Sequence, residues 1–350
     1  MRITLRTAAG IGCLVLGLGV GARGADDAPA AIKPPAPNRV DEPLAEQFSL
    51  PKAAEFLDAA SVTWTNQRKC GTCHTNYPYL MVRPLLGDAP ALREVRRFFE
   101  DRMAGWESDD PKKKPRWDME VVATASALAF HDAHTTGRLH PLTRRALDTM
   151  WTLQRADGSW NWLKCNWPPS EDDDYYGVLV AALGVGVAPD GYADTPAART
   201  GMAKVRAYLK AHRPPHLHHQ AMLLWASTLL PDRRPAAEQR STVKELLALQ
   251  RDDGGWSLPS LGNWQGFDRR PNDKHAPSDA YATGLIVYVL RRADQSADDP
   301  AIRRGVAWLR TNQRQSGRWF TRSLNTDRYH FISHAGTAYA VLALHACGVK

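Results

Sequence analysis

Two cysteines and a histidine stand at the spacing used for covalent attachment of haem. Cys70, Cys73 and His74 form the pattern Cys-x-x-Cys-His. In such a pattern the two thiols bond the haem vinyl groups and the histidine ligates the iron. The pattern predicts a c-type haem on Cys70 and Cys73, with His74 as its metal ligand. A Cys70–Cys73 disulfide or a thiol pair is the alternative, because oxidising compartments favour either state.

An acidic run, Glu171 to Asp174, precedes an apolar stretch that we expect to be helical. The partial positive charge of a helix N-terminus stabilises carboxylates in its first turn, so a solvated acidic turn is one interpretation. A buried carboxyl group held by hydrogen bonds can instead keep its proton and act as a general acid. Glu171, Asp173 and Asp174 are therefore candidate catalytic residues.

A histidine cluster follows two prolines. His216, His218 and His219 lie where an apolar helix is expected to begin. Two of these side chains could share a metal ion with an acidic residue from another helix, since imidazole and carboxylate are common zinc ligands. A polar helix start explains the same residues without a metal. The sequence leaves both interpretations open.

Composition and charge exclude several classes of function. The chain has 350 residues, of which 43% are hydrophobic and 23% are charged, which is an ordinary globular composition. Its net charge of +8 comes from scattered basic residues, whereas a nucleic-acid-binding face requires clustered charge. After the N-terminal region, no segment is long and apolar enough to predict a transmembrane helix. We therefore expect neither nucleic acid as a partner nor a membrane-spanning segment.

The N-terminal region is typical of an exported protein. Arg2 and Arg6 precede an apolar run from Ala8 to Val20, and small residues follow up to Ala25. This order predicts a cleavable signal peptide over residues 1–25 and a periplasmic or extracellular location. Residues 26–50 are rich in proline, alanine and charge, which predicts a flexible linker. Residues 51–350 are then left as one domain.

A repeat organises this domain. Three segments read Gln-Arg-x-x-Gly-x-Trp: Gln154–Trp160, Gln250–Trp256 and Gln313–Trp319. The segment Gln67–Cys73 matches with cysteine in place of tryptophan. Each copy ends an apolar periodic stretch, so its glycine fits a left-handed helix end and its tryptophan is expected to pin the turn against a neighbouring helix.

The spacing of the copies leaves room for two further helix pairs without the motif, since one pair takes about 40 to 50 residues. Residues 92–103 with 119–130, and residues 202–209 with 218–230, have the required apolar pattern. The sequence thus predicts six helix pairs. Their first helices are expected near residues 52, 90, 142, 198, 238 and 301.

The Gln-x-x-x-Gly-x-Trp repeat resembles the hallmark of triterpene cyclases such as squalene-hopene cyclase, and looser forms occur in prenyltransferase beta subunits. Residues 278–285 and 336–344 look like inner helices of that family. The resemblance implies an all-α fold, a single (α/α)6 toroid of six outer and six inner helices. Inner helices of such a ring begin at one end, where their partial positive charges gather. We expect Cys73, Glu171 and His216 near this mouth.

The resemblance also implies a chemistry. Hopene cyclases carry Asp-x-Asp-Asp, whose third residue protonates an alkene, and the aligned residues here are Glu171, Asp173 and Asp174. Asp173 is thus implied as the acid, although Glu171 and Tyr175 depart from the family's residues. A full cyclase has two helical domains and this chain has room for one. The implied function is a terpenoid-cyclase-like isomerase acting on, or binding, an isoprenoid or other apolar small molecule or lipid. The alternatives are a c-type haem-bearing redox or sensory protein and a non-catalytic binding scaffold. The sequence predicts neither the substrate nor the oligomeric state.

Overall fold

The computed structural model describes residues 32–106, 118–230 and 235–350. The predicted signal peptide, residues 1–25, and residues 26–31 of the predicted linker lie outside the described residues. Within the described part of the chain there are 12 α-helices, short 3-10 helices and only isolated β-bridges. The predicted all-α fold is confirmed. None of the described helices has both the length and the apolar character needed to cross a membrane.

Every second helix buries one face only. The buried residues of α3 are Ala91, Leu92, Val95, Phe99 and Met103, which recur about once per turn. Most of these helices begin with proline, whose fixed φ and missing N–H suit the first helical turn. The six outer helices are α1 (Leu50–Arg68), α3 (Pro90–Ala104), α5 (Pro141–Thr152), α7 (Pro196–Ala211), α9 (Ala236–Ala248) and α11 (Pro300–Thr311).

The intervening helices are apolar on all sides. In α10 every residue from Ala280 to Leu290 is buried, and in α12 every residue from Ser333 to Leu344. A helix without a polar face must be surrounded by protein. The six inner helices are α2 (Asn76–Val82), α4 (Asp118–His134), α6 (Asp174–Val187), α8 (Leu217–Leu229), α10 (Ala280–Arg292) and α12 (Ile332–Ala346). The 3-10 helices are η1 (Arg83–Leu86), η2 (Tyr192–Asp194) and η3 (Leu258–Leu261).

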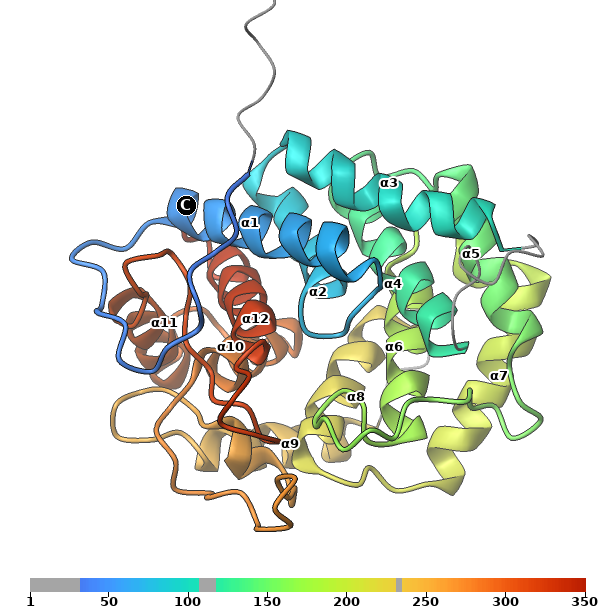
Figure 1. Cartoon of the computed structure of the whole chain (residues 1–350). Coiled ribbons are helices and arrows are strands. Elements are labelled where there is room, and N and C mark those ends of the chain that lie inside the picture. The colour runs from blue at the N-terminus through green and yellow to red at the C-terminus, as the bar shows by residue number, and fades with distance from the viewer. Residues whose placement is uncertain (1–31, 107–117, 231–234) are drawn as a thin grey trace, which may run out of the picture. The chain divides into compact units, whose positions relative to one another are not determined.

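The inner helices form a closed ring. Each contacts the next in chain order, and the last, α12, contacts the first, α2 (Figure 1). Each outer helix packs against an inner helix next to it in the chain, and α5, α7 and α9 pack against the inner helices that precede them, α4, α6 and α8. The predicted (α/α)6 toroid is therefore confirmed. The outer helices begin within two residues of the predicted positions, because the apolar period that marks them is a local property of the sequence.

The repeated glutamine joins neighbouring outer helices. Gln154 Nε2 donates to the carbonyl oxygen of Gly158 at 3.1 Å and to that of Gly201, in α7, at 3.0 Å. The indole of Trp160 donates to Met150 O, in α5, at 2.8 Å. The other two copies make the corresponding bonds, Gln250 to Gly254 and Ala301, Trp256 to Leu246, Gln313 to Gly317 and Ser49, and Trp319 to Leu309.

The repeated glycine is required by both conformation and packing. Gly158 has φ +95°, and a Cβ atom there would lie 2.3 Å from Lys204 O of α7. Gly254 and Gly317 have φ +89° and approach Arg304 O and Lys52 O in the same way. Glutamine, glycine and tryptophan thus pin each turn to the next outer helix. This confirms the structural role predicted for the three complete copies.

Residues 36–49, within the segment expected to be a flexible linker, are held against the end of the ring. The side chain of Arg318 is 2% exposed and forms an ion pair with Glu42. It also donates to the carbonyl oxygens of Ala36 and Pro37 at 2.8 and 2.6 Å. Figure 1 shows this segment in blue beside α11 and the chain that follows it. The linker interpretation therefore does not describe residues 36–49, because composition does not reveal a partner so distant in sequence.

Candidate active site

The candidate haem-binding and catalytic residues lie at one end of the ring. Because outer and inner helices alternate, all inner helices begin at this end, which we call the mouth. Cys73 and His74 precede α2, Glu171 lies in the segment before α6, and Phe331 is the N-cap of α12. A small cavity of about 30 Å³ brings all four together. We call it the mouth cavity, and its wall also includes Trp167, Pro168, Ser170, Ser323, Tyr329 and Ile332.

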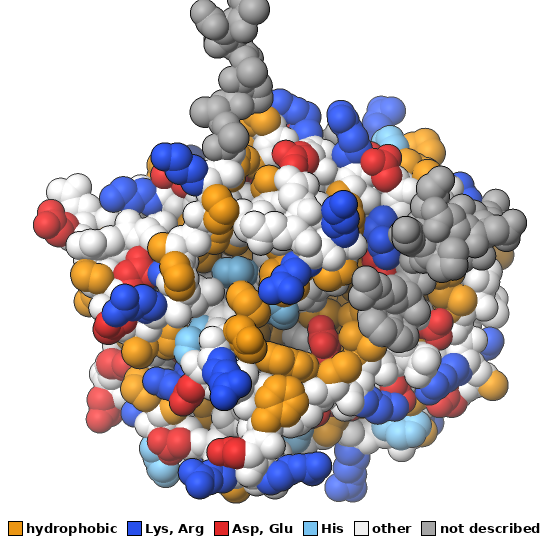
Figure 2. Space-filling view, in the orientation of Figure 1, with side chains coloured by type: hydrophobic (Ala, Val, Ile, Leu, Met, Phe, Trp, Pro, Cys, Tyr) orange, Lys and Arg blue, Asp and Glu red, His pale blue; other side chains and the backbone are white. Residues whose placement is uncertain are grey.

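Aromatic side chains surround the mouth cavity. Trp167 contacts Phe267 edge to face, with ring centroids 5.5 Å apart, and Tyr329 stacks on Phe331 at 5.6 Å. Phe267 and Tyr329 are 56% and 51% exposed, which is unusual for large apolar side chains. Figure 2 shows a hollow near the middle of one face, edged by hydrophobic side chains, with acidic and histidine side chains inside it.

Glu171 is the carboxyl group of the mouth cavity. A β-bridge between Trp167 and Glu171 holds its backbone, so a short hairpin directs it toward Cys73 and His74. Burial raises the pKa of Glu171 to about 7. Its carboxylate has no ion pair in the described part of the chain, so no cation offsets the cost of burying a charge. Glu171 is thus half protonated near neutral pH.

The two aspartates that follow have different surroundings. Asp173 caps α6 by accepting from Tyr176 N at 2.9 Å, and its other oxygen lies 3.1 Å from Nε2 of His219. Burial alone would raise the pKa of Asp173, but the hydrogen bond and the charge of His219 outweigh it, and the pKa is lowered. Asp174 pairs with Lys164 at 2.9 Å. Asp173 is thus held as a carboxylate, so the geometry favours Glu171 over Asp173 as a proton donor.

Cys73 lies near Glu171 in the wall of the mouth cavity. Burial, together with the charge of Glu171, raises the pKa of the Cys73 thiol, so the sulfur stays protonated. Burial also raises the pKa of Tyr176 and of Tyr281, and the charges of Tyr339 and Cys73 add to both shifts. Tyr176, Tyr281 and Tyr339 are buried side chains of the inner helices α6, α10 and α12. No local pattern in the sequence predicts this set, because it is brought together only by the ring.

His74 is enclosed by aromatic rings. It contacts Trp64 edge to face at 4.8 Å and stacks on Phe331 at 5.6 Å. A hydrogen-bonded chain runs from His74 Nδ1 to Thr75 Oγ1 at 2.9 Å, and from there to His334 Nδ1 at 2.9 Å. Burial lowers the pKa of both His74 and His334 to about 3. Both imidazoles are therefore neutral.

The packing around the predicted haem residues leaves no space for a porphyrin. The mouth cavity beside Cys73 and His74 has about the volume of one water molecule. Phe331 covers one face of the His74 ring. Cys70 and Cys73 are not joined to each other, since the described cysteines form no disulfide. The residues in this arrangement do not fit a haem, and the haem stays a prediction of the motif.

The disguised fourth copy of the repeat does not behave like the other three. Helix α1 continues through Arg68, and Lys69 rather than Gly71 takes the left-handed conformation at its end. The Gln67 side chain is exposed and makes no hydrogen bond with the described residues. Cys73 therefore does not occupy the position of the repeated tryptophan. The alignment was wrong in register because Gly71 is needed for another reason: a Cβ there would lie 2.1 Å from the Tyr77 hydroxyl.

The histidine cluster is built into the helix starts. His218 stacks near Tyr176 and Tyr281, and its Nε2 lies 3.1 Å from the Tyr281 hydroxyl. Burial, followed by the charges of His219 and His216, lowers the pKa of His218 well below its usual range. Across the described residues, no three His, Cys, Asp or Glu side chains form a group that could hold a metal ion. Packing and the Asp173–His219 pair account for this cluster.

Comparison with known proteins supports the fold. No protein-family model and no curated protein sequence matches the chain. Among solved structures, ent-copalyl diphosphate synthase from Streptomyces platensis matches with a TM-score of 0.50 and 15% identity over 78% of this chain, which spans 50% of that synthase. A glycosidase variant in complex with glucose matches with a TM-score of 0.55 and 10% identity, covering 85% of this chain and 96% of its own. A polysaccharide lyase matches with a TM-score of 0.51 and 11% identity, covering 84% and 96%. The chain thus has the toroid fold that a terpenoid cyclase shares with carbohydrate-active enzymes.

Proposed function

We propose that this protein is a terpenoid-cyclase-like isomerase that acts on an isoprenoid or similar apolar ligand, with Glu171 as its general acid. The observation that carries the proposal is Glu171 itself. It lines a cavity at the mouth, it has no ion pair in the described part of the chain, and burial raises its pKa to about 7. A pKa near the working pH is what a general acid requires.

The surroundings suit an apolar ligand. The mouth cavity is too small to enclose such a ligand, but Glu171 is only partly buried, and the exposed rings of Phe267 and Tyr329 offer an apolar surface close to it. We infer that the body of the ligand lies on these rings and that one alkene reaches Glu171. The Cys73 thiol and the neutral His74 next to Glu171 add no charge that would compete for its proton.

The proposed step is a proton transfer. The Glu171 carboxyl gives its proton to one alkene carbon, and the alkene π pair forms the new C–H bond. The carbocation left on the other carbon is attacked by a further double bond or loses a proton, which returns to a base. Substrate and product then have the same composition, so the overall reaction is an isomerisation and needs no redox partner.

Turnover in D₂O tests this assignment. Squalene and geranylgeraniol are incubated with the protein, and the products are analysed by gas chromatography with mass spectrometry. Wild type should give an isomer in which one deuterium replaces a hydrogen, and Glu171→Gln should reduce turnover at least about 100-fold with an unchanged circular dichroism spectrum. Asp173→Asn should retain more activity than Glu171→Gln. Unchanged turnover in Glu171→Gln would falsify the role of Glu171, and complete loss in Asp173→Asn alone would return that role to Asp173.

A second candidate function follows from the Cys-x-x-Cys-His motif at the mouth. The pattern Cys70-x-x-Cys73-His74 is that of a covalent c-type haem, and Phe331 would have to move away from the His74 ring to admit one. We propose export through residues 1–25 for either function, since haem attachment takes place outside the cytoplasm.

Mass spectrometry of the mature chain tests both proposals. The protein is purified from the periplasm of a host proficient in haem attachment. A mass one haem above that of the polypeptide, lost in Cys70→Ala/Cys73→Ala, supports the haem. A colourless protein of polypeptide mass excludes it. A mass that still includes residues 1–25 contradicts cleavage of the signal peptide.

A further inference from the structure

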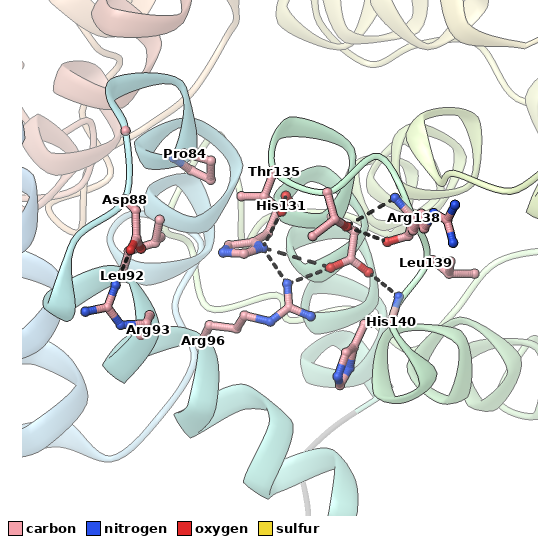
Figure 3. Close-up of a pocket in the computed structure, with 13 residues that line it drawn as sticks. Pro84, Asp88, Leu92, Arg93, Arg96, His131, Thr135, Arg138, Leu139 and His140 are labelled. Atoms are coloured by element: carbon pink, nitrogen blue, oxygen red, sulfur yellow. Dashed lines mark hydrogen bonds and ion pairs between the residues drawn. The ribbon is translucent and has the colours of Figure 1, made fainter.

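A second pocket lies at the opposite end of the ring from Glu171. It has a volume of about 540 Å³, which is within the range of small-molecule sites. Its wall is formed by the chain from Pro84 to Asp88, by the first half of α3, by the end of α4, and by residues 135–140, which lead to α5 (Figure 3). Because inner helices begin at the mouth, the end of α4 faces away from it. We call this site the distal pocket.

A buried ionic network forms the floor of the distal pocket. Arg96 Nη1 donates to Asp132 at 2.6 Å, and Arg96 Nε donates to Glu100 at 2.7 Å. The second oxygen of Asp132 accepts from the backbone N–H of His140 at 2.8 Å. The side chain of Asp132 is 2% exposed. Both oxygens of Asp132 are thus engaged within the protein, and Figure 3 shows the Arg96 side chain pointing toward His131.

Two guanidinium groups of the distal pocket retain unused donors. Arg138 is exposed at the rim, and its guanidinium forms no ion pair or hydrogen bond with the described residues. The Nη2 group of Arg96 likewise makes no hydrogen bond with them. Arg93, by contrast, is paired with Asp88. Arg96 is balanced by Asp132 and Glu100, so the positive charge open to a ligand is that of Arg138, and Arg96 Nη2 adds a hydrogen-bond donor.

The rest of the wall is aliphatic. Pro84 and Leu92 are buried, and Leu139 is partly buried, so the distal pocket offers an apolar surface beside the arginines. A guanidinium group prefers a carboxylate, which it can bind through two parallel hydrogen bonds. We propose that the distal pocket binds a small amphipathic acid, with its carboxylate at Arg138 and Arg96 and its aliphatic chain against Leu92 and Leu139. This site is independent of the function proposed for Glu171.

Binding of two probes of equal length and opposite charge tests the proposal. Octanoate and octylammonium are titrated into the full mature chain at pH 7 by isothermal titration calorimetry. Octanoate should bind with one-to-one stoichiometry and octylammonium should not. Arg138→Gln should weaken octanoate binding about tenfold, since a charge-assisted hydrogen bond is removed. Arg240→Gln, at an exposed arginine of α9 outside the pocket, is the matched control and should bind like wild type.

Filling the pocket provides a second test that does not involve charge. Leu139→Trp places a larger side chain in the distal pocket and should abolish octanoate binding, with circular dichroism and thermal unfolding used to verify the fold. Absence of octanoate binding to the wild type would overturn the proposal. Equal affinity for both probes would do the same, as would octanoate binding that survives both Arg138→Gln and Leu139→Trp.

Discussion

Neighbouring carboxyl groups of one acidic run differ in proton affinity because their surroundings differ. Asp173 accepts a backbone hydrogen bond at a helix start and faces His219, whereas Glu171 lies against a thiol and aromatic rings without a cation. The first environment stabilises the carboxylate and the second stabilises the acid. The residue that can donate a proton is therefore the one with the fewest polar contacts.

The raised pKa of Glu171 has a consequence for stability. The folded protein holds a proton that the unfolded chain releases between about pH 4.5 and pH 7, so the free energy of unfolding falls as pH rises through this window. A pKa shift of this size changes the free energy of unfolding by at most about 3 kcal/mol. Glu171→Gln should therefore stabilise the protein relative to wild type at pH 8 more than at pH 4.5.

Urea unfolding at these two pH values measures the effect. Asp268→Asn, at an exposed aspartate, serves as the control and should show no such difference. If Glu171→Gln changed the free energy of unfolding equally at both pH values, the carboxyl group would not be the buried acid described above.

At the scale of elements, the three complete repeats connect neighbouring outer helices. In each, glutamine bonds the following outer helix, or the residue that precedes it, tryptophan bonds the preceding outer helix, and glycine lets the two backbones touch. The motif therefore predicts toroid architecture and carries no information about catalysis, since none of its side chains lines the mouth cavity.

Alanine substitutions at two glycines with the same backbone conformation distinguish the cost of backbone strain from the cost of a steric clash. Gly87 has φ +93° and open space where a Cβ atom would lie, whereas at Gly158, with φ +95°, a Cβ atom would meet Lys204 O at 2.3 Å. Gly87→Ala should cost about 1 kcal/mol through strain alone. Gly158→Ala should cost about 2 kcal/mol more, because α5 and α7 must move apart. Chemical denaturation measures both, and equal losses would show that the contact with α7 is unimportant.

At the scale of the whole molecule, the ring is closed where its two ends in sequence meet. Helix α12 packs against α1 and α2, and residues 36–49 cover the last repeat. Glu42 and Arg318, 276 positions apart, form the ion pair of this closure. Arg318 is almost fully buried, so its charge depends on Glu42 and on the carbonyl groups of the same segment.

A double-mutant cycle tests this closure. Glu42→Gln should destabilise the protein by about 3 kcal/mol, because it leaves a buried guanidinium without its counter-charge. Arg318→Met in the same chain should recover part of that loss, which a denaturant-based cycle measures as an interaction energy. Asp41→Asn removes an exposed ion pair with Arg39 in the same segment and should leave stability unchanged. Additive effects of Glu42→Gln and Arg318→Met would contradict the closure role.

The sequence by itself determined the architecture. Apolar period, proline at helix starts and the repeated Gln-Arg-x-x-Gly-x-Trp are local features, so the six helix pairs and the start of each outer helix could be predicted from residues close together in the chain. The positions of Cys73, Glu171 and the histidines near one mouth followed from the alternation of helices in the ring.

Only the tertiary structure decided which of these residues share an environment. The raised pKa of Glu171 depends on the burial that the ring imposes, and the carboxylate of Asp173 is held by His219, which lies in the first turn of another inner helix. Residues 36–49 are held in place by contacts with Arg318. The distal pocket is formed by two loops and two helices that meet in space. Burial and charge pairing are set by contacts between residues far apart in sequence, and a local pattern carries no record of those contacts.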